Sequence, residues 1–277
     1  MFYYKNWECF CRWINSIGIK TYTAQESLAS VSDKRFIVLK HDVETNVRRA
    51  FKLAEIEHSH GISGSYYVQA YLLESSQNIE MLKKMQDMGH EISYHYDVLD
   101  ANNGDYIAAE NDFDKWIQKF KDLGFRFKTI CQHGNPIKKR VGYTSNRDFF
   151  RDRDIRERHS DLVDMVVNYS AYTKYPYVYI SDAGYMWKHI TSPENNDVDA
   201  SSTDVSIGDF GKLKKFILST SSNVILSTHP HRWENSYFKI ESKICVFKVV
   251  RKTVRIIQKL PIANQLLNRF YFLAKKI

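Results

Sequence analysis

Short hydrophobic runs alternate with longer amphipathic segments from residue 36 onwards. The runs have the length of strands, and the segments carry apolar residues three and four positions apart, which is the spacing of a helix face. In chain order the pattern predicts strand 36–40, helix 45–59, strand 64–69, helix 77–88, strand 90–95, helix 104–123 and strand 127–132. A glycine follows each of the three helices, where helices commonly end. This alternation of strand and helix predicts a parallel sheet or barrel.

The hydrophobic pattern is weaker in the second half of the chain. It predicts a strand at 177–181, a helix near 208–219 and a strand at 223–228. The charged stretch 140–160 predicts a solvated helix or an excursion from the sheet, and the polar segment 191–206 predicts a loop. Because no low-complexity linker interrupts this region, residues 35–238 are expected to form one domain.

The two ends of the chain differ from this domain. Residues 1–34 are expected to form a helical flank that packs an aromatic face across the bottom or side of the barrel. Residues 239–277 contain ten Lys or Arg and one acidic residue, so they account for the whole net charge of +8. Since the rest of the chain is close to neutral, a nucleic-acid-binding body is not expected.

The basic tail predicts an amphipathic helix. Its apolar positions are Phe247, Val250, Val254 and Ile257, opposite Lys248, Arg251, Lys252, Arg255 and Lys259, and a second apolar set follows Pro261. Such a segment can lie on anionic lipid, so residues 240–277 are a candidate for peripheral contact with the inner face of a membrane. Packing against the barrel or against a partner protein is the alternative.

Cysteine usage and the N-terminus narrow the choice of compartment. Cys9, Cys11, Cys131 and Cys245 form neither a CxxC pair nor a regular framework, so neither a structural zinc site nor a disulfide scaffold is expected. The N-terminus lacks the pattern of a signal peptide, and no apolar window of 18 residues predicts a membrane-spanning helix. We therefore expect a cytoplasmic protein with reduced thiols; the oligomeric state is left open.

Ionisable residues follow several of the predicted strands. They are His41, Asp42, His95, His133, Asp182 and His229. A barrel brings the carboxyl ends of its strands to one rim, so these side chains are expected to share a pocket. Imidazole and carboxylate together bind zinc and similar divalent metals, and a bound cation acidifies its water into a nucleophile.

Three of these residues also have a purely structural interpretation. Asp42 is a candidate cap for the helix that follows it. His95 is a candidate core imidazole that bonds to its neighbours. His133 lies in the turn-like sequence QHGNP, where its ring can bond to the backbone.

Five motifs resemble, in order and rough spacing, those of the polysaccharide deacetylase superfamily, also called the NodB-homology or carbohydrate esterase family 4 group. They are KHDVE at 40–44, GHEISYH at 89–95, QHGNP at 132–136, SDAGYMW at 181–187 and LSTHP at 226–230. The resemblance covers roughly residues 35–235. It implies a distorted (β/α) barrel of about seven parallel strands, a metal held by one Asp and two His, and hydrolysis of an N- or O-acetyl group on a sugar.

The resemblance assigns roles residue by residue. Asp42 and His95 match metal ligands, His41 stands where the family has an aspartate acting as general base, and His229 matches the acid that protonates the leaving amine. Asp182 matches a residue that orients catalytic groups. The expected metal is zinc, with cobalt, nickel or manganese as alternatives.

The third ligand is expected at His133, because Leu99 stands where the family has its second histidine. Asp97, Asp100 and Glu44 are the alternatives for that ligand. The residues expected to contact a carbohydrate substrate are Tyr96, Asn135 and Trp187.

The sequence therefore predicts a metal-dependent hydrolase that removes an acetyl group from a sugar of a surface polysaccharide or its precursor. The motif set is similar to a divergent bacterial branch associated with surface-polysaccharide biosynthesis. Two alternatives stay open: a catalytically weak or inactive glycan-binding protein, and an amidase acting on a small cyclic or nucleotide-linked substrate.

Overall fold

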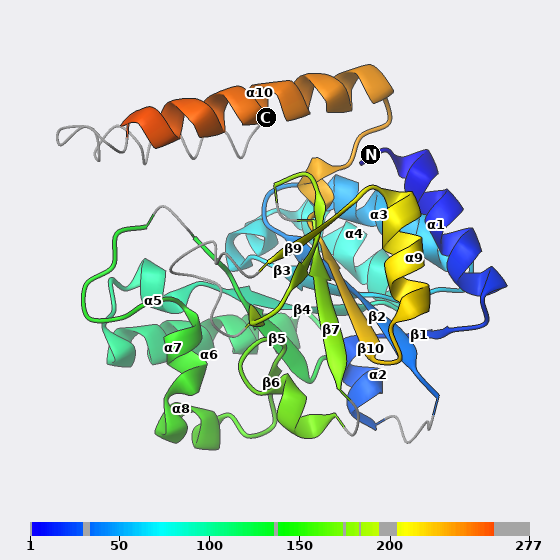
Figure 1. Cartoon of the computed structure of the whole chain (residues 1–277). Coiled ribbons are helices and arrows are strands. Elements are labelled where there is room, and N and C mark those ends of the chain that lie inside the picture. Colours follow the sequence, from blue (N-terminus) through cyan, green and yellow to red (C-terminus); the bar gives the residue numbers. More distant parts are fainter. Residues whose placement is uncertain are drawn as a thin grey trace.

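The computed structural model describes residues 2–29, 34–135, 138–173, 176–182, 184–193 and 204–257. Its centre is a sheet in which seven parallel strands are neighbours in the order β6-β5-β4-β3-β2-β10-β7 (Figure 1). These strands are β2 (Phe36–Val43), β3 (Ser65–Val68), β4 (Glu91–Tyr96), β5 (Thr129–Gln132), β6 (Val163–Asp164), β7 (Tyr177–Ser181) and β10 (Asn223–Thr228). The predicted α/β fold with about seven parallel strands is therefore confirmed.

Three further short strands extend this parallel set. β8 (Trp187–Ile190) pairs antiparallel with β7, and β9 (Val205–Gly208) pairs antiparallel with β8. β1 (Lys20–Tyr22) pairs with the first half of β2, so the N-terminal flank contributes a strand as well as helices. The pattern did not predict these strands, because each is short and only partly buried.

The sheet is rolled into an open barrel. Side chains from β5 and β6 meet side chains from β7 and β8 in one buried cluster, although four strands separate β5 from β7 in the sheet order. In the described residues β6 pairs only with β5, so the seam between β6 and β7 is closed by side chains rather than by a strand ladder.

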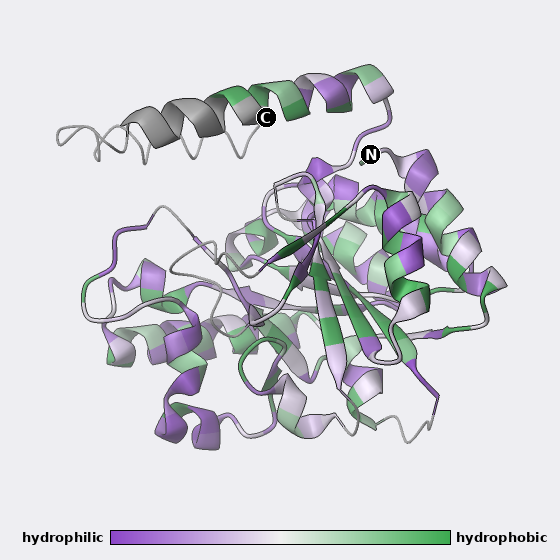
Figure 2. Cartoon of the chain, in the orientation of Figure 1, coloured by the Kyte–Doolittle hydropathy of each residue, from purple (hydrophilic) through white to green (hydrophobic). Residues whose placement is uncertain are grey.

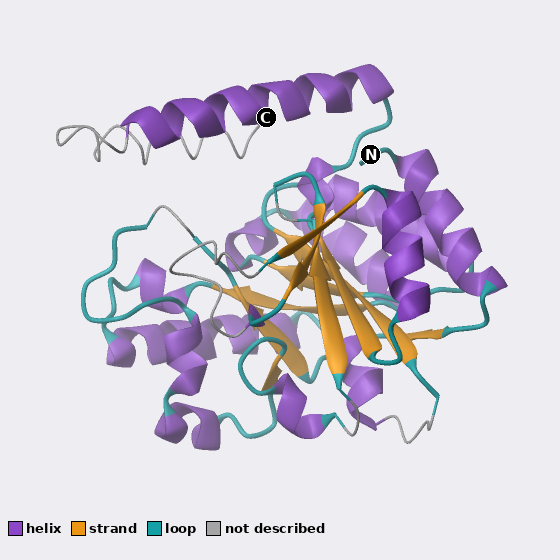
Figure 3. Ribbon diagram, in the orientation of Figure 1, coloured by secondary structure: helices purple, strands orange, loops and turns teal. Residues whose placement is uncertain are grey.

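Helices cover the outer face of the sheet (Figure 3). They are α1 (Tyr4–Ser16), α3 (Val47–Ser59), α4 (Ser76–Asp87), α5 (Val98–Ala101), α6 (Tyr106–Asp122), α7 (Arg147–Arg151), α8 (Arg153–Arg158) and α9 (Phe210–Ser219). The short helix α2 (Ala24–Ala29) packs instead on the inner cluster, where Ala24 lies with Val38 and Tyr67. Two outer clusters form under them: one joins α3, α4 and α6 to β3 and β4, and the other joins α1, α3 and α9 to β2 and β10. Figure 2 shows the expected pattern, with green strands and helices that alternate green and purple.

Local signals set the ends of these helices. Asn46 caps α3, because its side-chain oxygen accepts from the backbone N–H of Arg49 at 3.1 Å, and Asp105 and Asp209 cap α6 and α9 in the same way. Asp42 is not the cap of α3, so the structural interpretation of that residue is wrong. Gly124 ends α6 with φ +85°, a conformation that glycine adopts without strain.

The C-terminal segment begins as helix α10 (Tyr237–Ile257), which lies apart from the barrel in Figure 1. Its first turns are anchored, because Ile240 is buried, Ile244 packs on the same cluster as α1, and Lys243 pairs with Glu234 at 2.7 Å. The predicted apolar stripe from Phe247 onwards, and the second set after Pro261, lie outside the described side chains. None of the described helices has the length and hydrophobicity that crossing a membrane requires.

Candidate functional site

A pocket of about 180 Å³ opens at the carboxyl ends of β2, β4, β5, β7 and β10. Its ionisable lining residues are Lys40, Asp42, Glu44, His95, Cys131, Arg147 and His229. The site therefore lies where parallel α/β folds gather functional groups, as the sequence predicts.

Strand β2 contributes two of these side chains and the residue directly after it a third, because successive residues of a strand point to opposite faces. Lys40, Asp42 and Glu44 line the pocket inside the barrel, and all three are at least nine-tenths buried. His41, between them, points to the outer face. In the sheet β2 lies between β3 and β10, and the end of β10 also contributes Ser227 to the pocket lining.

Lys40 and Asp42 form a buried ion pair. The ammonium bonds to Oδ1 of Asp42, lies 3.4 Å from Oγ of Ser227, and sits over the ring of Tyr67 at 5.3 Å. Burial would raise the pKa of the Asp42 carboxyl, but the charge of Lys40 is the main cause that lowers it to about 2, and the hydrogen bond from its ammonium acts in the same direction. Asp42 is therefore an anion with an internal counter-ion.

Two overlapping groups of side chains have the chemistry of a divalent-metal site. One is Glu44, His95 and His133, and the other is Asp42, His95 and Cys131; within each group the ligand atoms lie within 4.8 Å of one another. Burial lowers the pKa of His95 to about 3, so its imidazole is neutral, the form that binds a metal. Carboxylate and imidazole ligands at this separation fit a zinc-like cation.

Both histidines are held in place by the backbone around them. Nδ1 of His95 lies 3.0 Å from the carbonyl of Cys131, which leaves Nε2 to face the pocket. His133 lies 3.4 Å from Glu44 through Nε2. The buried Asn146 donates to the carbonyl of His133 at 2.9 Å and to Asp100 at 3.0 Å, so it ties the loop that presents His133 to α5.

Asp182 and His229 form an oriented pair at the rim. Nδ1 of His229 lies 2.7 Å from Oδ1 of Asp182, whose Oδ2 also accepts from the His229 backbone N–H at 2.9 Å. Although burial opposes it, Arg232 and His229 hold the pKa of Asp182 well below its usual range. Nε2 of His229 then faces Glu44 at 3.7 Å and Asp42 at 3.9 Å. This is the geometry of a histidine that exchanges protons in the pocket.

His41 does not reach this pocket, which corrects its expected role as the base. Its Nε2 lies 2.9 Å from Oε1 of Glu57, and its ring stacks on Tyr66 with centroids 4.2 Å apart. Trp7 and Tyr66 donate to the same carboxylate at 2.9 and 2.8 Å. Matching His41 to a family motif overlooked the alternation of β2, which places it in a fully buried network under α1 and α3.

Two expected substrate contacts are also misplaced. Tyr96 is buried on the outer face of β4 among Phe113, Phe149 and Phe150. Trp187 is fully buried in the outer cluster against Phe2. Neither ring is accessible to a sugar.

The third expected contact, Asn135, follows Gly134 of the pocket lining, and its carbonyl accepts from Arg140 at 3.0 Å. Of the alternative third ligands, Asp100 is held by a two-point contact with Arg140 at 2.8 and 2.9 Å, whereas Glu44 lies in the pocket.

Sequence reasoning assigned no role to Lys40 or Arg147 and gave Glu44 only as an alternative third ligand. Lys40, Asp42 and Glu44 stand at every second position, and this spacing could have indicated that Lys40 and Glu44 point the same way as Asp42. Arg147 follows a charged, weakly patterned stretch, and nothing in the sequence connects it with the strand ends.

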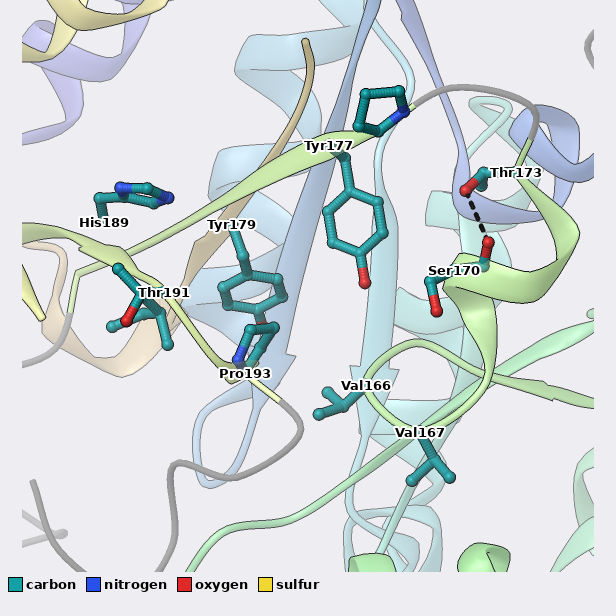
Figure 4. Close-up of a pocket in the computed structure, with 11 residues that line it drawn as sticks. Val166, Val167, Ser170, Thr173, Tyr177, Tyr179, His189, Thr191 and Pro193 are labelled. Atoms are coloured by element: carbon teal, nitrogen blue, oxygen red, sulfur yellow. Dashed lines mark hydrogen bonds between the residues drawn. The ribbon is translucent and has the colours of Figure 1, made fainter. Parts of the chain in front are cut away.

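A second cavity, of about 450 Å³, adjoins the pocket along the seam between β7–β8 and the segment after β6 (Figure 4). The two share Val166, Tyr179, Ile190 and Pro193 in their linings. Figure 4 shows the rings of Tyr177 and Tyr179 extending from β7 on the same side, toward Val166. The site therefore continues into a groove with two aromatic rings.

No family model and no curated protein matches this sequence. Three solved structures resemble it at 10% identity. A family 4 carbohydrate esterase from Streptomyces lividans in complex with acetate has a TM-score of 0.42, covering 79% of this chain and 90% of that chain. A mutant of a family 4 pseudoenzyme with restored enzymatic activity has a TM-score of 0.43, with coverages of 80% and 64%. The wild-type pseudoenzyme, from Bacillus anthracis, has a TM-score of 0.41, with coverages of 78% and 61%.

Proposed function

We propose that this protein is a metal-dependent hydrolase that removes an acetyl group from the nitrogen, or from an oxygen, of a sugar in a surface polysaccharide or its precursor. The observation that supports this most directly is the grouping of His95 and His133 with Glu44, and of His95 with Asp42, beside the oriented Asp182–His229 pair. The five sequence motifs favour the same class of reaction.

A divalent cation, most simply zinc, would be held by His95 and its neighbouring carboxylate and would polarise the acetyl carbonyl when bound. His229 supplies proton transfer, because its Nε2 faces the pocket while Asp182 holds the proton on Nδ1. In the forward reaction this imidazole takes a proton from the attacking water and returns one to the leaving amine or alkoxide.

The groove beside the pocket is the proposed place for the sugar. Tyr177 and Tyr179 supply flat rings against which a pyranose can pack, and Ser170 and Thr173 supply hydroxyl groups at its far wall (Figure 4). These tyrosines take over the role that the sequence assigned to Trp187.

A glycan-binding protein without hydrolase activity is the second candidate. It is favoured by the Lys40–Asp42 pair, because an ammonium already neutralises one of the carboxylates that a cation would need. Binding of an acetylated oligosaccharide by protein stripped of metal, with no release of acetate after metal is restored, would support this candidate.

The test is metal analysis of the purified protein, followed by acetate release from acetylated oligosaccharides. His95→Ala is expected to abolish both metal content and activity, since His95 belongs to both candidate ligand groups. His58→Ala, at an exposed histidine of α3, is the matched control and should change neither. Full metal occupancy in the His95 variant would refute the assignment.

We also propose that the protein works in the cytoplasm, on the inner face of the membrane, with α10 and the basic residues after it in contact with anionic lipid. The exposed Phe238 and Val249 on α10, together with the ten basic residues of 239–277, support this proposal.

A further inference from the structure

The two candidate ligand groups share His95 but differ in their carboxylate, and the surroundings of the two carboxylates are not alike. Asp42 has both oxygens engaged: Oδ1 bonds to Lys40, and Oδ2 accepts from Ser227 at 3.3 Å. Glu44 follows two residues after Asp42 and lies nearer the rim. Its Oε1 is 3.4 Å from Nε2 of His133 and 3.7 Å from Nε2 of His229.

Lys40 cannot leave Asp42 easily. The residue is 1% exposed, and its ammonium is enclosed by Asp42, Ser227 and the face of Tyr67. A divalent cation on Asp42 would lie beside this ammonium, and two neighbouring positive charges in a buried site repel each other strongly. Displacing the ammonium would leave a buried charge without its partner.

We propose that the metal ligands of this protein are Glu44, His95 and His133, and that Lys40 keeps Asp42 out of the coordination shell as a fixed internal ion pair. This deepens the proposed function and rests on it. The set differs from the one that the sequence motifs imply, in which Asp42 holds the cation.

The proposed ligand set also accounts for the alternate positions of Lys40, Asp42 and Glu44. Lys40, Asp42 and Glu44 follow one another toward the rim on one face of the sheet, so Lys40 and Asp42 neutralise each other and Glu44 lies beside the two histidines His133 and His229. Glu44 is then 3.7 Å from Nε2 of His229, whereas Cys131 interacts with Lys40.

The experiment measures zinc affinity of metal-stripped full-length protein by competition with a chromophoric chelator, and the visible spectrum after loading with cobalt. Glu44→Gln is expected to weaken zinc binding by about 100-fold or more, because it removes a charged ligand. Losing a residue that only hydrogen-bonds to a ligand weakens metal binding by roughly 10- to 100-fold, and losing the ligand itself should cost more. Glu91→Gln, a buried glutamate at the other end of the barrel, is the matched control and should bind zinc like wild type.

Asp42 is tested with Lys40→Met and Asp42→Asn combined, because removing both charges avoids leaving either one buried alone. The double variant is expected to keep zinc affinity within about threefold of wild type, well below the tenfold step that corresponds to roughly 1.4 kcal/mol. Cys131→Ser should leave the cobalt spectrum unchanged, since the proposed set contains no thiolate.

The results separate this inference from the proposed function. Loss of zinc binding in the double variant with retention in Glu44→Gln, or a thiolate-to-cobalt absorption band that disappears in Cys131→Ser, would overturn the ligand assignment while leaving a metal-dependent hydrolase intact. Absence of any cation binding by folded wild-type protein would overturn both.

Discussion

Replacing Glu57 by Leu tests the network on the outer face of β2. Glu57 is fully buried, and three groups point at its carboxylate: Trp7 and His41, each 2.9 Å from Oε1, and the hydroxyl of Tyr66, 2.8 Å from Oε2. Leucine keeps much of the volume but leaves these polar groups without their acceptor. A buried polar group left unsatisfied costs about 1–3 kcal/mol, and breaking a buried charged pair costs about 3–5 kcal/mol.

We therefore expect Glu57→Leu to lower the free energy of unfolding by about 3–5 kcal/mol, a large share of the roughly 5–15 kcal/mol typical of a domain. The measurement is urea unfolding followed by circular dichroism at neutral pH. Glu55→Leu makes the same change two residues away on α3, where the glutamate is 42% exposed and pairs only with Lys52. This control should change stability by no more than about 0.5 kcal/mol.

The pH dependence supplies a second check on the same variant. The pKa of Glu57 is lowered in the folded state: burial opposes the shift, but His41 and the hydrogen bond from Tyr66 outweigh it. Its contribution is therefore complete above the ordinary glutamate pKa of about 4.3 and is lost as the pH falls through the lower folded value. The difference in the free energy of unfolding between wild type and Glu57→Leu should therefore become smaller in acid. A destabilisation of less than about 1 kcal/mol at neutral pH would contradict the reasoning, and so would a difference in unfolding free energy that grows in acid.

Three further predictions concern the pocket, the barrel interior and the tail. Asp182→Asn should lower kcat by about 100- to 10,000-fold with little change in KM, because the amide cannot hold the proton on Nδ1 of His229; steady-state acetate release on folded variant checks this, and unchanged kcat would exclude the role. Burial raises the pKa of Glu91, so its ionisation destabilises the fold as the pH rises above the ordinary carboxyl pKa. The melting temperature of Glu91→Gln should therefore match that of wild type near pH 4 and be equal to it or higher at pH 8. Deleting residues 246–277, which keeps the anchoring Ile240 and Ile244, should abolish flotation with anionic liposomes without lowering the melting temperature, and retained flotation would place lipid contact elsewhere.

The sequence predicted the parallel core well because its strands are nearly continuous apolar runs. β7 and β10 have the predicted bounds, and β2 begins at the predicted Phe36 but continues three residues farther, to Val43. That extension carries the site: the polar residues after the apolar run are still strand, so alternation, and not chain proximity, decides which of them face the pocket. The strands β8 and β9 could not be predicted in this way, since their burial depends on contacts with β7 and on Trp187 packing under α9.

The sequence predicted site residues best where two chemically complementary residues follow neighbouring strands. Asp182 directly follows β7, and His229 directly follows the neighbouring strand β10. The register between the two strands pairs Ser181 with Ser227, so the side chains of Asp182 and His229 come into contact. His41 and Trp187 were assigned from motif position alone, and both proved to lie on the outer face. A motif identifies which residues a strand end carries, but the direction of each side chain follows from the register.

Strand β2 separates two buried polar networks that differ in one physical respect. On the outer face, Glu57 accepts from Trp7 and Tyr66 and lies 2.9 Å from Nε2 of His41, and neither His41 nor Glu57 lines the pocket. On the inner face, Lys40 and Asp42 pair with each other, whereas Glu44 lines the pocket with His229 and lies 3.4 Å from Nε2 of His133. Buried charge with its partners in place contributes to the fold, whereas buried charge facing a cavity favours a ligand that completes it. Since the two networks share only the backbone of one strand, substitutions on the outer face should change stability with little effect on cation binding, and substitutions of Glu44 should do the reverse.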